Sequence, residues 1–182
     1  MYTGAVMYYE KSENTMFSIL VSPISHQDII ISKVIANVIH QTISTMLVVI
    51  AFVLLNNVSF SISVLFIMIL SIGFHTLLGF VFTYTAKDFT SMLTNFMFVM
   101  IVLATPSILV YVQVFDVSTW LSYVLLLSPI EQATLMISNS FSNNYDIQFF
   151  VSVILMIIYT IVIYKLYVLP KFSTYVQKGS GV

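Results

Sequence analysis

The sequence predicts an all-α, polytopic integral membrane protein with a single transmembrane domain. Of its 182 residues, 59% are hydrophobic and only 7% are charged, whereas soluble domains carry roughly 25% charged residues. Four segments are apolar over about the 20 residues that a membrane-spanning helix needs. These segments are residues 34–55, 62–84, 92–114 and 149–168.

A polar stretch, residues 10–33, precedes the first of these segments. Residues 10–21 have the pattern of a short amphipathic helix, and Pro23 ends it because proline cannot continue a helix and restricts the residue before it. Ser25 is a good N-cap for a new helix, with Asp28 in the place that glutamate takes in a capping box. The stretch is therefore predicted to be a helix-break-helix hinge at the edge of the membrane.

The hinge carries a recognisable order of residues: Glu10-Lys11, Asn14-Thr15, an apolar run that closes in Leu20-Val21-Ser22-Pro23, polar Ser25 to Asp28, and Lys33. This order resembles the cytoplasmic coupling segment of ABC-2-type transporter permeases. The resemblance implies that the segment docks on a separate ATPase subunit and passes its motion to the membrane helices. The residues that would couple are Glu10, Lys11, Asn14, Thr15, Phe17, Leu20, Pro23 and Asp28. The alternative is an ordinary amphipathic helix that lies on lipid headgroups.

Residues 1–9 are apolar but only about half as long as a spanning helix, and they lack the pattern of a signal peptide. We interpret them as the cytoplasmic end of a helix whose earlier part is missing. Permeases of the resembled family usually have six spans, and the coupling segment follows the second. The resemblance therefore implies that this chain lacks the first span and most of the second.

The lysines set the predicted orientation. Alternation of four spans places Lys11, Lys33, Lys87, Lys165, Lys171 and Lys178 on one side, and Asp116, Glu131 and Asp146 on the other. By the positive-inside rule the lysine side is cytoplasmic. We therefore expect a cytoplasmic hinge and a cytoplasmic tail, residues 170–182, that frays, in a bacterial cell membrane. All six basic residues are lysines, and so few positive charges make nucleic acid an improbable partner.

Two spans carry polar residues on one helical face. Asn37, His40, Gln41 and Ser44 follow helical spacing in the first, so this stripe should face other helices or a water-filled cavity rather than lipid. Ser71, His75, Gly79 and Thr83 recur every four residues in the second, a ridge that suits close helix packing. His75 is interpreted as a hydrogen-bonded packing residue in preference to a proton-linked pathway residue.

The third span contains Pro106, which predicts a kink. The connection that follows, residues 115–146, holds the interfacial aromatic residue Trp120 and then Ser128-Pro129-Ile130-Glu131, a helix start with serine as N-cap, proline in the first turn and glutamate closing a capping box. Two short helices that dip into the outer leaflet are predicted here. Permeases of the resembled family carry a similar extracytoplasmic re-entrant helical hairpin, with a proline in the place of Pro129.

Catalytic chemistry is not predicted. The sequence has no phosphate-binding Gly-x-x-x-x-Gly-Lys-Ser/Thr loop, zinc-protease motif or nucleophile elbow. Cysteine is absent, and His26, His40 and His75 are expected at different membrane depths, so no metal site is predicted. The chain itself is expected to hold no cofactor, since a partner subunit would bind the ATP.

The resemblance implies the permease subunit of an ATP-driven exporter, in which two permease copies or paralogues pair in the bilayer and bind cytoplasmic ATPase subunits. Apolar spans without intramembrane charge favour a hydrophobic or amphipathic cargo, such as a drug, lipid, glycan or peptide. Two alternatives remain at this point. One is an ion- or proton-coupled secondary transporter that uses His40 and His75, and the other is a non-transporting membrane protein such as an immunity or assembly factor.

Overall fold

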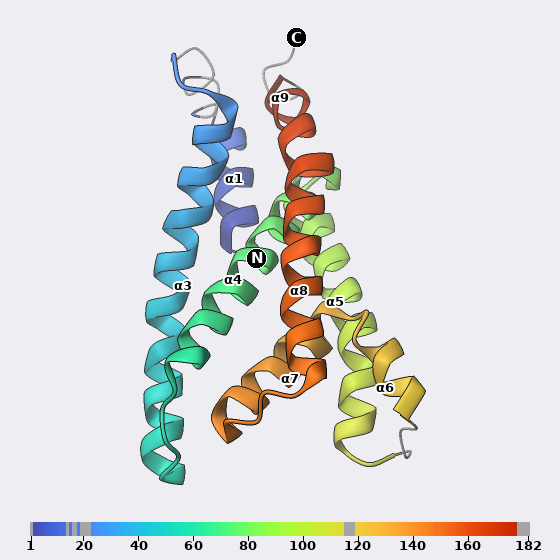
Figure 1. Cartoon of the computed structure of the whole chain (residues 1–182). Coiled ribbons are helices and arrows are strands. Elements are labelled where there is room, and N and C mark those ends of the chain that lie inside the picture. The colour runs from blue at the N-terminus through green and yellow to red at the C-terminus, as the bar shows by residue number, and fades with distance from the viewer. Residues whose placement is uncertain (1, 14, 16–17, 19–22, 115–118, 178–182) are drawn as a thin grey trace. The chain divides into compact units, whose positions relative to one another are not determined.

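The computed structural model describes residues 2–13, 15, 18, 23–114 and 119–177, and these ranges contain helices and no strand (Figure 1). In chain order the helices are α1 (Tyr2–Ser12), α3 (His26–Asn56), α4 (Ile62–Thr85), α5 (Phe89–Tyr111), α6 (Thr119–Leu125), α7 (Pro129–Ser142), α8 (Ile147–Ile163), the π-helix η1 (Tyr164–Val168) and α9 (Leu169–Gln177). The predicted all-α class is confirmed.

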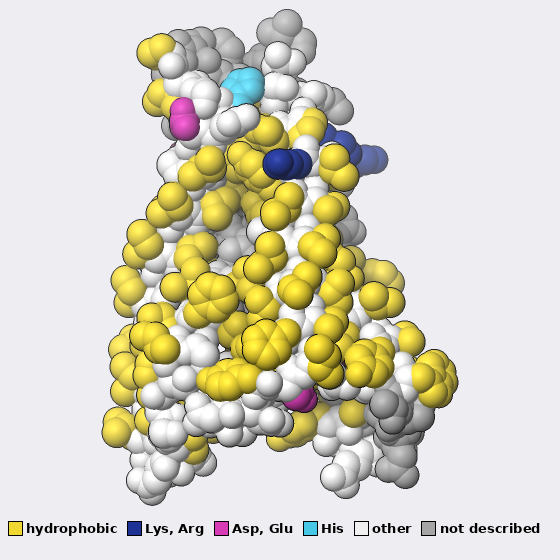
Figure 2. Space-filling view, viewed as in Figure 1, with side chains coloured by type: hydrophobic (Ala, Val, Ile, Leu, Met, Phe, Trp, Pro, Cys, Tyr) yellow, Lys and Arg dark blue, Asp and Glu magenta, His cyan; other side chains and the backbone are white. Residues whose placement is uncertain are grey.

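Four of the helical stretches are long and apolar enough to cross a membrane: His26–Asn56, Ile62–Thr85, Phe89–Tyr111 and Ile147–Gln177. Many of their large apolar side chains are exposed, among them Leu47 (68%) and Leu55 (82%). Figure 2 shows hydrophobic side chains over most of the visible surface of α3 and α8. A soluble monomer rarely exposes so much contiguous apolar surface. The chain is therefore a multi-pass membrane protein, as its composition predicts.

Local capping signals fix where two of these helices begin. At the start of α3 the Ser25 hydroxyl accepts a hydrogen bond from the Asp28 N–H (3.2 Å) and donates one to the Asp28 carboxylate (2.6 Å). At the start of α5 the exchange is reciprocal, because the Asp88 N–H donates to the Ser91 hydroxyl (3.2 Å) and the Ser91 N–H donates to the Asp88 carboxylate (2.7 Å). Each arrangement satisfies amide groups that a helix start otherwise leaves without partners.

The predicted helix over residues 10–21 begins in the wrong place. Glu10 and Lys11 lie in the last turn of α1, which begins at Tyr2, and the Glu13 N–H still donates to the Tyr9 carbonyl (2.9 Å). The apolar letters before Glu10 are helical, so the charged pair ends a helix instead of opening one. Residues 14, 16–17 and 19–22 lie outside the described ranges.

The prediction that the tail frays is wrong for residues 170–177. These residues belong to α9, which buries Phe172, Tyr175 and Val176. The turn before α9 is a π-helix, in which the Leu169 N–H donates to the Tyr164 carbonyl. Proline has no N–H and crowds the carbonyl four residues earlier, so a widened turn before Pro170 allows the helix to continue. Residues 178–182 lie outside the described part of the chain.

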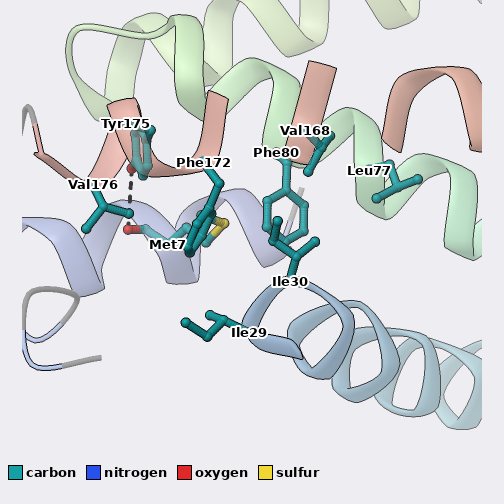
Figure 3. Close-up of a cluster of buried hydrophobic side chains, with 9 residues drawn as sticks. All are labelled: Met7, Ile29, Ile30, Leu77, Phe80, Val168, Phe172, Tyr175 and Val176. Carbon is teal, nitrogen blue, oxygen red and sulfur yellow. Dashed lines mark hydrogen bonds between the residues drawn. The ribbon is translucent and has the colours of Figure 1, made fainter. Parts of the chain in front are cut away.

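The chain divides into two compact units, which are described separately. Unit 1 comprises Met1–Thr42, Ile72–Phe96 and Tyr159–Val182. Its core joins α1, the first turns of α3, α4 and the end of the last helix, which is the continuous stretch α8–η1–α9 (Ile147–Gln177) (Figure 3). In this core the Tyr175 hydroxyl donates to the Met7 carbonyl (3.5 Å). The buried members are Met7, Ile29, Ile30, Leu77, Phe80, Val168, Phe172, Tyr175 and Val176.

Unit 2 comprises Ile43–Ser71 and Met97–Ile158, and it contains α6 and α7. The Gln132 side chain is buried and donates to the Leu126 carbonyl (2.6 Å), which fixes the turn between these two short helices. Ser128 is the N-cap residue of α7 and Pro129 stands in its first turn, as predicted. The predicted capping box is wrong, because the Ser128 hydroxyl makes no cap and donates to the Leu103 carbonyl of α5 (3.1 Å).

Candidate functional site

An ion pair joins the two ends of the predicted coupling segment. The Lys33 ammonium of α3 lies 2.5 Å from the Glu10 carboxylate in the last turn of α1. The side chains are only 15% and 25% exposed, respectively, so water screens this pair less than it would screen a surface pair. Because 23 residues separate the partners in sequence, the pair holds the end of α1 beside the start of α3.

Apolar packing supports this ion pair. Ile29 and Ile30, in the first turns of α3, are buried in the core of unit 1 together with Met7 of α1 and Phe172 of α9 (Figure 3). The His26 ring lies 5.5 Å from the Phe172 ring, between centroids. The beginning of α3 is therefore held on two sides, by α1 and by α9, and the apolar part of the helix follows.

The proposed coupling residues that the structure describes differ in exposure. Thr15 is exposed, and its hydroxyl donates to the Glu10 carbonyl (3.0 Å). Pro23 and Asp28 are also exposed, which leaves both accessible to a partner. Three further predicted coupling residues, Asn14, Phe17 and Leu20, lie outside the described ranges.

The polar stripe of the first span is engaged in helix packing at two of its four positions. Asn37 is buried, and its side-chain amide donates to the Thr76 hydroxyl of α4 (2.6 Å). Thr76 donates in turn to the Ile72 carbonyl (2.7 Å). The contact between α3 and α4 therefore satisfies the Thr76 hydroxyl and the Asn37 amide N–H, while the buried Asn37 Oδ1 has no hydrogen-bond partner among the described residues. The His40 ring stacks on the Tyr2 ring of α1, with centroids 5.1 Å apart and planes 15° apart.

The other two members of that stripe are less enclosed. Gln41 is half-buried in unit 1, and Ser44 is exposed in unit 2. The stripe is thus divided between the two units at Thr42. Sequence spacing places all four residues on one helical face, but it does not reveal which of them meet a neighbour.

The ridge on the second span includes a close contact between helices. The Thr83 hydroxyl donates to the Gly79 carbonyl (2.7 Å), and Gly4 of α1 lies directly against both residues. A methyl group added at Gly4 would stand 2.7 Å from the Thr83 hydroxyl oxygen and 3.0 Å from the Gly79 carbonyl oxygen. His75 lies edge-on to its neighbour Phe74, with ring centroids 5.4 Å apart. Gly4 is not among the residues predicted from the sequence, although a small residue opposite a small-residue ridge is the signal for such a contact.

The predicted hairpin residues lie on α6 and α7 or between them. Trp120 is 68% exposed on α6, and Glu131 is half-buried in the first turn of α7. After α7 the Tyr145 hydroxyl shares hydrogen bonds with the hydroxyls of Ser61 (3.4 Å) and Ser63 (2.9 Å) at the turn between α3 and α4. These bonds, that of Ser61 first, lower the pKa of Tyr145.

The residue types that bind metals do not converge in the described part of the chain: no group of three or more His, Cys, Asp or Glu side chains lies close enough to hold an ion. The features that do converge are structural, namely a half-buried ion pair, a buried amide–hydroxyl bond and a close contact at glycine. No protein-family model, curated protein or solved structure matches the chain. Functional inference therefore depends on its own residues.

Proposed function

We propose that the chain is the permease subunit of an ATP-driven ABC transporter of the ABC-2 type. Residues 10–33 form its coupling segment, which docks on a cytoplasmic ATPase subunit. A second permease, either a copy or a paralogue, pairs with it in the bilayer. Hydrolysis of ATP takes place in the partner, and this chain supplies the pathway.

The observation that carries the proposal is the construction of α3. This helix begins at a capped turn within the coupling segment and continues without interruption to Asn56, over an apolar length sufficient to cross a membrane. Its first turns are tied to α1 by the Glu10–Lys33 pair and to α9 by apolar packing. A helix that is held firmly at one end and continuous with a span can pass a displacement of that end into the membrane.

The distribution of charge supports a cytoplasmic coupling segment. Every lysine among the described residues belongs to unit 1, whereas the charged residues described in unit 2 are Glu131 and Asp146, both acidic. Such segregation follows the positive-inside rule if the lysine-rich ends face the cytoplasm. Both the coupling segment and α9 would then lie on the side where an ATPase is available.

Export of a hydrophobic or amphipathic substrate is the transport activity we propose. An apolar hollow of about 270 Å³ opens between α3, α4 and the last helix within unit 1. Its lining residues are Ile31, Val34, Ile35, Leu77, Thr160, Ile161 and Tyr164. A charged solute would lose its hydration against such a wall without gaining a polar partner. The apolar part of an amphipathic substrate has no such hydration to lose.

The proposal is tested by exchanging the charges of the Glu10–Lys33 pair. Glu10→Lys and Lys33→Glu each place two like charges together, whereas the double exchange restores an ion pair of opposite polarity. In proteoliposomes that also contain the ATPase encoded nearest the gene, each single variant should lower vanadate-sensitive ATP hydrolysis. The double variant should recover a large part of it. Lys165→Glu, a charge reversal at an exposed lysine of η1, is the matched control.

The result that would contradict the coupling role is hydrolysis that stays at the native level in both single variants while the proteins remain folded. A secondary transporter gives a different result altogether: its transport would persist without any ATPase and would follow the proton gradient. The stacking of His40 on Tyr2 gives that histidine a packing role. His40→Gln should therefore lower the free energy of unfolding, and it should not change any dependence of transport on the proton gradient.

A further inference from the structure

A hollow with a basic lining lies in unit 1 and shares one residue, Lys11, with the coupling segment. Its volume is about 540 Å³, and it is formed by the end of α1, the end of α4 with the connection to α5, and the last helix. Its lining residues are Lys11, Tyr84, Thr85, Ala86, Lys87, Tyr167, Lys171, Thr174 and Tyr175. A neighbouring hollow of about 250 Å³ shares Lys11, Ala86, Lys87 and Tyr175 with it.

Three lysines from three separate parts of the sequence meet at this hollow. Lys11 comes from the last turn of α1, Lys87 from the connection after α4, and Lys171 from α9. None of the residues that line the hollow is acidic. Figure 2 shows lysine side chains on the visible face near the C-terminal end of the stretch α8–η1–α9.

Tyrosines bring aromatic faces and hydroxyl donors to the same wall. The Lys171 ammonium lies 3.8 Å from the centre of the Tyr167 ring, and the Lys11 ammonium lies 4.2 Å from the centre of the Tyr175 ring. The Tyr84 and Tyr175 rings are 4.8 Å apart between centroids. The Tyr84 hydroxyl is shielded from solvent and has no hydrogen-bond partner among the described residues, although buried polar groups usually have one.

We infer that this hollow binds a phosphate-bearing anion, and that the anion is the headgroup of an acidic membrane lipid. Three ammonium groups that converge on one hollow favour a ligand with negative charge, and a phosphate oxygen can accept from both ammonium and tyrosine hydroxyl donors. The hollow lies at the ends of helices long and apolar enough to span a membrane. Basic pockets in that position are suited to anionic headgroups. This inference does not depend on the proposed coupling to an ATPase.

Binding is tested by native mass spectrometry of the full chain released from nanodiscs, with phosphatidylglycerol compared with phosphatidylcholine. The native chain should retain phosphatidylglycerol preferentially. Each of Lys11→Gln, Lys87→Gln and Lys171→Gln should weaken retention about fivefold, since a lysine near an anionic surface contributes about 1 kcal/mol. Lys165→Gln is the matched control, because Lys165 is also exposed on the last helix but does not line the hollow. It should change retention less than twofold.

A second arm separates the sources of the phosphate group. Inorganic phosphate and glycerol phosphate are added at millimolar concentration, and displacement of phosphatidylglycerol that requires the same three lysines would assign the hollow to a soluble phosphate anion. Equal retention of the two lipids by the native chain would overturn the inference. The inference would also be overturned if Lys171→Gln and Lys87→Gln retained phosphatidylglycerol as strongly as the native chain. Both lysines are exposed, so we expect these two substitutions to leave the fold intact.

Discussion

The close contact between α1 and α4 gives the sharpest stability prediction. A β-carbon on residue 4 would stand 2.7 Å from the Thr83 hydroxyl oxygen, 3.0 Å from the Gly79 carbonyl oxygen and 3.3 Å from the Met92 sulfur. Thr83 is almost fully buried and its hydroxyl is already bound to the Gly79 carbonyl, so it has little freedom to turn away. Gly4→Ala must therefore push α1 away from α4, and overpacking of this kind costs about 1–3 kcal/mol.

Gly73→Ala is the matched control for this substitution. A β-carbon on residue 73 of α4 would have no atom within 4 Å, so the same chemical change meets open space. Alanine is the better helix former by roughly 0.5–1 kcal/mol. We therefore expect Gly73→Ala to leave the free energy of unfolding unchanged or slightly higher, and Gly4→Ala to lower it.

The assay is unfolding in mixed micelles of dodecylmaltoside and increasing sodium dodecyl sulfate, followed by far-ultraviolet circular dichroism. Thr83→Ala supplies a further test, because it removes the oxygen that lies closest to the added methyl group. In that background Gly4→Ala should cost less than it does alone, which is a positive coupling between neighbouring sites. The reasoning is refuted if Gly4→Ala and Gly73→Ala have the same effect, or if the cost at residue 4 is independent of Thr83.

Three further predictions use the same assay. Asn37→Leu and Thr76→Val remove the two partners of one buried hydrogen bond. In a double-mutant cycle their effects on the free energy of unfolding should be coupled by about 0.6 kcal/mol, and by at most about 1.7 kcal/mol. Additive effects would contradict that bond. Phe172→Ala should lower the free energy of unfolding by about 3–5 kcal/mol because it leaves a cavity in the core of unit 1. Leu166→Ala, at an exposed residue of η1, should lower it much less. Equal losses would mean that α9 does not pack against that core. Ser128→Ala should cost about 1 kcal/mol through its lost bond to α5, and no loss would show that this bond is not formed.

Much of the fold can be predicted from the sequence because its signals are local. Apolar length specifies the spans: predicted segments 34–55, 62–84 and 149–168 each lie within one observed helical stretch. The predicted segment 92–114 starts inside α5 but runs past its end at Tyr111. Ser25 and Asp28 mark the start of α3 because an N-cap needs only a hydroxyl and the amides that follow it. The same kind of signal at Asp88 and Ser91 marks the start of α5, although the sequence analysis placed that helix from residue 92.

The features that sequence reasoning missed depend on distant partners. Ser128 has the letters of a capping residue, yet its hydroxyl donates to a carbonyl 25 residues earlier in the chain. The polar letters after Pro170 suggested a frayed tail, whereas Phe172, Tyr175 and Val176 have the helical spacing of one buried face. The Glu10–Lys33 pair and the contact at Gly4 are likewise invisible until α1, α3 and α4 are brought together.

The central claim is that residues 10–33 couple the membrane helices to an ATPase, and a detergent pull-down tests it most directly. The chain is captured together with the ATPase encoded nearest its gene, and the native sequence is compared with Phe17→Asp and Leu20→Asp. Leu127→Asp, at an exposed position between α6 and α7, is the control for an added charge. We predict that the native chain and the control retain the ATPase while both coupling-segment variants, still inserted in membrane, release it. Equal retention by all four proteins, or no retention by the native chain, would contradict the claim.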